Sequence, residues 1–124
     1  MEGPEAHIDL SAVVANWRML ASLAPGAEPA AVVKADAYGL GAQPAARALH
    51  AAGARRFYVA WPQEGAALRH AMGPDARIAV FHGFAGADPK LFRTHALEPV
   101  LNSLADIATW TALGADRPPA ALHL

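Results

Sequence analysis

Lys34 closes a short apolar run, and an amine at that place can do chemistry. The four residues before it, Ala30 to Val33, are all small and apolar. Burying an ammonium group is costly unless the group is paired, deprotonated or used covalently, so this lysine calls for a partner. An aldehyde cofactor suits an amine best. Taken alone, a lysine after an apolar run is more often a strand-end residue whose amine reaches solvent.

The loop that follows the lysine has a composition suited to holding a ligand. Tyr38 lies four residues after Lys34, and its hydroxyl could reach back toward the same ligand. Gly39 and Gly41 permit a tight turn and a close approach of the backbone. We expect Asp36 to order the loop backbone rather than to act on a cofactor. Lys90 is the other lysine, and we expect it to be solvated on a short polar helix.

Helices and strands alternate strictly around this segment. An amphipathic helix begins at Ser11, which we expect to cap it, and ends at Pro25-Gly26. Further helices are predicted at 43–52, at 62–72, in a short segment after Asp88, and at 103–113. Short apolar strands are predicted at 29–34, 57–60, 77–81, 98–101 and 120–124. Strands that are apolar throughout indicate a parallel sheet covered on both faces.

A parallel sheet whose strands alternate with helices is typical of a (β/α)₈ barrel or of a doubly wound fold. The barrel is favoured because Pro44 stands where a dinucleotide-binding motif needs its third glycine, and because Lys34 lies at the carboxyl end of a strand. A full barrel needs about 250 residues, so we expect residues 1–124 to form about its first half. A complete five-stranded flavodoxin-like domain is the alternative that fits the length.

Composition excludes several classes of partner. Hydrophobic residues make up 54% of the chain and charged residues 17%, with a net charge of -1, which favours a globular domain over a nucleic-acid-binding or membrane-binding one. No apolar stretch is long enough to span a membrane, and the amino terminus is acidic. The chain has no cysteine, and its six histidines lack metal-ligand spacing. We therefore expect a cytoplasmic protein without a metal site.

Residues 31–41, Ala-Val-Val-Lys-Ala-Asp-Ala-Tyr-Gly-Leu-Gly, resemble the pyridoxal-phosphate attachment motif of alanine racemases. Further segments follow in the family's order and spacing, although each is weak by itself. They are Ile8-Asp9-Leu10 with Asn16, Ala45–Leu49 with Ala52-Gly53-Ala54, Glu64–Arg69, Leu97–Val100 and Leu122-His123-Leu124. The resemblance covers nearly the whole chain but only the first half or less of such an enzyme.

The resemblance implies a set of site residues. Lys34 is the residue that binds pyridoxal 5'-phosphate and carries a proton at the substrate Cα, and Tyr38 is the one that hydrogen-bonds the cofactor phosphate. Val32 shares a strand face with Lys34 and is expected to line the pocket beneath the ring. Phe81 is expected to pack on the ring, where the family often has leucine. Leu40 stands where histidine is common in the family, with little expected consequence.

The resemblance also implies an activity and an assembly. Alanine racemases interconvert L-alanine and D-alanine, supply D-alanine for peptidoglycan, and form homodimers. Their second proton-carrying residue is a tyrosine of a C-terminal β domain, which residues 1–124 do not contain, so we expect this chain alone to be inactive. Two alternatives remain from the sequence. One is a single-domain pyridoxal-phosphate homeostasis protein of the related barrel family, and the other is a doubly wound binding module in which Lys34 is structural.

Overall fold

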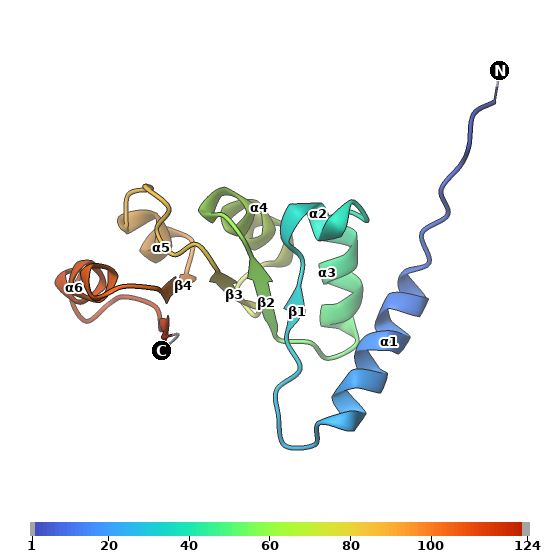
Figure 1. Cartoon of the computed structure of the whole chain (residues 1–124), viewed down its shortest axis with the longest axis horizontal. Helices are drawn as coiled ribbons and strands as arrows, with labels where there is room; N and C mark the ends of the chain where they lie inside the picture. Colours follow the sequence, from blue (N-terminus) through green and yellow to red (C-terminus); the bar gives the residue numbers. More distant parts are fainter. Residues whose placement is uncertain (1, 123–124) are drawn as a thin grey trace.

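The computed structural model describes residues 2–122, which form one parallel sheet with helices between its strands (Figure 1). The strands are β1 (Ala31–Val32), β2 (Arg56–Val59), β3 (Arg77–Val80), β4 (Leu97–Leu101) and β5 (Ala121–Leu122). The helices are α1 (Leu10–Leu23), α2 (Lys34–Tyr38), α3 (Ala42–Ala51), α4 (Pro62–Met72), α5 (Lys90–Thr94) and α6 (Leu104–Ala112).

The strand order identifies the architecture. The five strands lie side by side in the order β1-β2-β3-β4-β5, and every neighbouring pair is parallel. A doubly wound sheet reverses its strand order at a switch point, whereas a (β/α)₈ barrel adds each strand beside the last. The strands therefore form an arc of a barrel with helices around its outside (Figure 1). The expected incomplete barrel is confirmed, and the doubly wound alternative is wrong.

The main apolar core lies between the sheet and the helices. Alternate residues of β2, β3 and β4 point to this outer face, and they are fully buried there: Phe57, Val59, Ile78, Val80 and Leu97. Gly65 lets α4 approach the sheet closely, because a Cβ added to it would lie 3.1 Å from Leu97 Cδ1. The same core includes Phe84, Phe92 and Trp110, whose rings pack edge to face or tilted.

Most predicted elements are confirmed, with three corrections at their ends. The cap of α1 is Asp9 rather than Ser11: the Asp9 carboxylate accepts hydrogen bonds from the backbone N–H groups of Ser11 and Ala12, and the bond from the Ser11 hydroxyl is the main cause that lowers the pKa of Asp9. The first strand covers only 31–32, because the backbone turns away at Lys34. The last strand covers 121–122, and residues 123–124 lie outside the described part of the chain.

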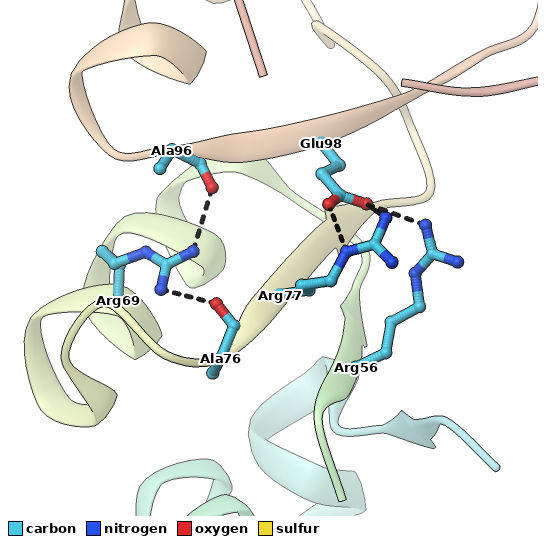
Figure 2. A network of polar contacts seen from close by, with 6 residues as sticks. All are labelled: Arg56, Arg69, Ala76, Arg77, Ala96 and Glu98. Atoms are coloured by element: carbon cyan, nitrogen blue, oxygen red, sulfur yellow. Dashed lines mark hydrogen bonds and ion pairs between the residues drawn. The ribbon is translucent and has the colours of Figure 1, made fainter. Parts of the chain in front are cut away.

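The inner face of the sheet carries a buried ion-pair network at its amino-terminal edge (Figure 2). Glu98 is only 3% exposed, although it is a charged residue near the start of β4, whose other residues are apolar. Its carboxylate accepts hydrogen bonds from Arg56 at 2.8 Å and from Arg77 at 2.8 and 3.2 Å. The bond to Glu98 is the main cause that raises the pKa of Arg77. One carboxylate thus connects the first residues of β2 and β3 to β4.

Arg69 fastens the carboxyl end of α4 to the loops that lead into β3 and β4. Its guanidinium donates to the backbone carbonyls of Gly73, Ala76, His95 and Ala96 at 2.6 to 2.9 Å, two of which Figure 2 shows. Burial of the guanidinium lowers the pKa of Arg69, which still leaves it charged at neutral pH. A planar five-donor group is needed for this many acceptors, so lysine could not replace it.

Candidate functional site at the carboxyl end of the first strand

Lys34 follows β1 at the carboxyl edge of the sheet, the edge at which barrel enzymes place their active sites. It shares the inner face with Val32, and its Nζ lies 5.9 Å from the centre of the Phe81 ring, which follows β3. Among residues 2–122, no carboxylate oxygen lies within ion-pair distance of this amine. Within that range, the amine of this half-buried residue is therefore not held by an ion pair.

A row of side chains runs from Lys34 along the inner face toward the opposite edge of the sheet. The ring of Phe81 stacks on that of Tyr58, with centroids 4.9 Å apart. The guanidinium of Arg56 lies 5.7 Å from the centre of the Tyr58 ring and is bonded to Glu98. The aromatic pair thus separates the uncommitted amine from the charged network below it.

The segment after Lys34 has an unusual backbone, which is a left-handed helical turn. Ala35, Asp36, Ala37 and Tyr38 have φ between 51 and 56°, and Gly39 follows with φ 88°. For residues with a Cβ, this conformation costs roughly 1–2 kcal/mol each, so consecutive examples need support from their surroundings. Sequence reasoning predicted a loop here and missed the turn, because alanine and aspartate carry no signal for four left-handed residues in a row.

Two carboxylates support this turn from opposite ends. The backbone N–H of Ala35 donates to Glu64 Oε2 at 2.8 Å, and that of Ala42 donates to Asp36 Oδ1 at 2.8 Å. Asp36 therefore does order the loop backbone, as expected. Asp36 and Glu64 also border a cavity of about 170 Å³ between α3 and α4, with Val59 and Leu68 among its apolar walls. Glu64 was not predicted as a site residue.

The other predicted site residues lie on the same edge of the sheet. Val32 is paired with Tyr58 in register and is 41% exposed on the inner face. Tyr38 closes the left-handed turn and is 64% exposed, so its hydroxyl is accessible to a ligand. Asn102 is a further residue that was missed: its amide donates to the backbone carbonyls of Phe81 at 3.1 Å and Val100 at 3.2 Å. The two hydrogen bonds together hold the loop that carries Phe81 against the end of β4.

Two further findings concern metals and membranes. Within residues 2–122, no three acidic or histidine side chains come together in an arrangement that could hold a metal ion. In the same range, none of the helices combines the length and the apolar character that crossing a bilayer requires.

The fold and the site together define a class: a (β/α)-barrel domain with an uncommitted lysine at the carboxyl end of its first strand. Comparison with known families narrows this class. The model of the alanine racemase N-terminal domain matches residues 8–124, and the chain belongs to this family. Solved structures agree with the assignment.

Three comparisons measure how close the similarity is. The alanine racemase of Acidiphilium cryptum is 50% identical over all of this chain, which spans 35% of that protein. The alanine racemase of Methylobacterium nodulans is 46% identical over 98% of the chain and 34% of its own length. The crystal structure of alanine racemase from Bartonella henselae, which has covalently bound pyridoxal phosphate, matches 86% of this chain and 30% of its own with a TM-score of 0.81 and 40% identity. The chain thus spans about a third of these relatives.

Proposed function

We propose that residues 1–124 form the cofactor-binding first part of a barrel whose whole protein interconverts L-alanine and D-alanine. The observation that carries the proposal is Lys34, because its amine lies at the carboxyl edge of the sheet, without an ion pair among residues 2–122, against the face of Phe81. Membership of the family, together with 50% sequence identity to an alanine racemase over this segment, supports alanine as the substrate.

The residues at this edge fit pyridoxal 5'-phosphate. An amine without an ion pair suits an aldehyde, the aromatic ring of Phe81 suits one side of a pyridine ring, and the exposed Tyr38 hydroxyl suits a phosphate oxygen. Val32, half-exposed on the inner face, is an apolar contact for the same ring. When bound, pyridoxal phosphate supplies an electron sink for the negative charge that develops at the substrate Cα.

Lys34 has two tasks in this proposal. Its Nζ binds the cofactor covalently at rest, and it carries a proton to or from one face of the substrate Cα during racemisation. Both tasks need an amine that is free to react, and no carboxylate among residues 2–122 is paired with Lys34 Nζ. In the family, the proton on the opposite face is carried by a tyrosine of a C-terminal β domain across a homodimer, and we propose the same arrangement for the whole protein.

A chimeric enzyme tests the proposed activity. We expect full-length Acidiphilium cryptum alanine racemase to keep forming D-alanine from L-alanine when this chain replaces its matching amino-terminal segment, since the two are 50% identical there. D-alanine is measured by chiral chromatography, with the unaltered relative as control. A chimera that folds and binds pyridoxal phosphate but racemises no alanine contradicts the proposal.

A further inference from the structure

Glu64 occupies a position between two strand ends that is unusual for a helix-capping residue. It lies in the first turn of α4, and its Oε1 accepts hydrogen bonds from the backbone N–H groups of Ala60 at 3.0 Å and Trp61 at 2.9 Å. These two bonds cap the helix and close the turn after β2. Capping of α4 requires only Oε1, yet Oε2 of the same carboxylate also accepts a hydrogen bond.

The second oxygen reaches a different β–α unit. Glu64 Oε2 accepts a hydrogen bond from the backbone N–H of Ala35 at 2.8 Å, 29 residues away in the sequence. Ala35 is the residue next to Lys34 and the first of the four left-handed residues. One carboxylate therefore joins the exit of β2 to the start of the turn that carries the lysine.

The turn depends on such a contact because its own conformation is unfavourable. Residues with a Cβ rarely adopt consecutive left-handed conformations, so the turn persists only where neighbouring groups hold it. The direction in which Lys34 leaves the backbone is fixed by the peptide that joins it to Ala35. Loss of the bond to Glu64 would release that peptide and let the amine sample other directions.

We propose that Glu64 is a positioning residue for Lys34, which holds the left-handed turn so that the amine stays on the inner face beside Phe81. The inference rests on the proposed function, because it assigns Glu64 a part in presenting Lys34 to the cofactor aldehyde. It differs from a capping role, which concerns only α4. The two roles make different predictions for the reactivity of the lysine.

Glu64→Gln separates the two roles with little change in shape. The glutamine amide has a single acceptor oxygen, so its NH₂ group must face an N–H donor on one side, and one of the two connections is lost. In the 124-residue chain, each lysine amine condenses with the aldehyde of pyridoxal phosphate with loss of water. Borohydride then delivers hydride to the carbon–nitrogen double bond and leaves a stable secondary amine, which peptide mass mapping assigns to Lys34 or Lys90.

We expect Glu64→Gln to slow labelling of Lys34 about tenfold and to leave labelling of Lys90 unchanged, because one bond to a charged acceptor is lost. Glu64→Asp should behave similarly, since its side chain is too short to reach both strand ends. Exposed Glu2→Gln is the control for the change in net charge, and far-UV circular dichroism checks that each variant is folded. Amide hydrogen exchange without cofactor should show faster exchange at Ala35 in Glu64→Gln.

The outcomes distinguish this inference from the proposed function. Equal labelling rates of Lys34 in the wild type and in a folded Glu64→Gln chain overturn the positioning role and leave Glu64 as a helix cap. Equal labelling of Lys34 and Lys90 in the wild type overturns the proposed cofactor function, and the positioning role with it. In that case, faster exchange at Ala35 in Glu64→Gln would still show that the carboxylate holds the turn.

Discussion

Lys34→Ala in the chimeric enzyme is expected to lower the rate of alanine racemisation by about 10³-fold or more, because the proposed function assigns Lys34 both the covalent attachment of the cofactor and one proton transfer. Proton transfer by one positioned side chain contributes about 10²- to 10⁴-fold by itself. Binding of pyridoxal phosphate should weaken as well but should persist in part, since Tyr38 and Phe81 remain. The measurement is the initial rate of D-alanine formation at saturating L-alanine and cofactor.

Two matched variants make this result specific. Lys34→Arg keeps the positive charge but cannot condense with an aldehyde, so it should be as inactive as Lys34→Ala. Lys90→Ala removes the chain's other lysine, which is exposed at the start of α5, and should keep the wild-type rate. Retention of more than a tenth of the activity by Lys34→Ala would refute the assigned role.

Glu98→Ala is expected to lower the free energy of unfolding by about 3–5 kcal/mol, because it leaves two partly buried guanidinium groups without their shared carboxylate. Domains are stable by only about 5–15 kcal/mol, so the variant should be largely unfolded in mild denaturant. The measurement is urea unfolding followed by circular dichroism. Replacing either arginine by alanine should cost less, because Glu98 keeps one partner in either case. Arg77→Ala should cost least, because the Arg77 side chain is 45% exposed against 22% for Arg56.

A triple variant tests whether the network of Arg56, Arg77 and Glu98 is itself stabilising or only costly to leave incomplete. Replacing the whole set at once, with Arg56→Met, Glu98→Leu and Arg77→Met, should cost far less than Glu98→Ala, because no charge is then left buried and unpaired. The hydrogen bond to Glu98 raises the pKa of Arg77, which is already high in a free arginine, so Arg77 stays charged around neutral pH. Its bond to Glu98 should therefore not weaken between about pH 6 and pH 9. A triple variant less stable than Glu98→Ala would contradict this explanation.

Strand and helix alternation could be predicted because it depends on local residue patterns. The apolar runs that became β2, β3 and β4 are short and bounded by glycine, proline or charged residues, and each was placed to within one or two residues. The barrel could be inferred from this alternation together with the place of Lys34. Only the strand order, which is a tertiary property, excluded the doubly wound fold.

The left-handed turn and the charged network could not be predicted in the same way. The turn depends on a hydrogen bond from Ala35 to Glu64, and a contact over 29 residues leaves no local signal. Glu98 did carry a signal, because a glutamate inside an apolar strand must find a partner when buried. Its partners could have been sought in Arg56 and Arg77, each of which is the first residue of a neighbouring strand.

The central claim is that Lys34 is the amine to which pyridoxal phosphate binds, and the most direct test is the position of the covalent label in the wild-type chain. With only two lysines in the sequence, borohydride trapping followed by peptide mass mapping gives an unambiguous assignment. We predict that the label lies on Lys34 in large excess over Lys90 at low cofactor concentration. A label that lies mainly on Lys90, or equally on both, would contradict the account.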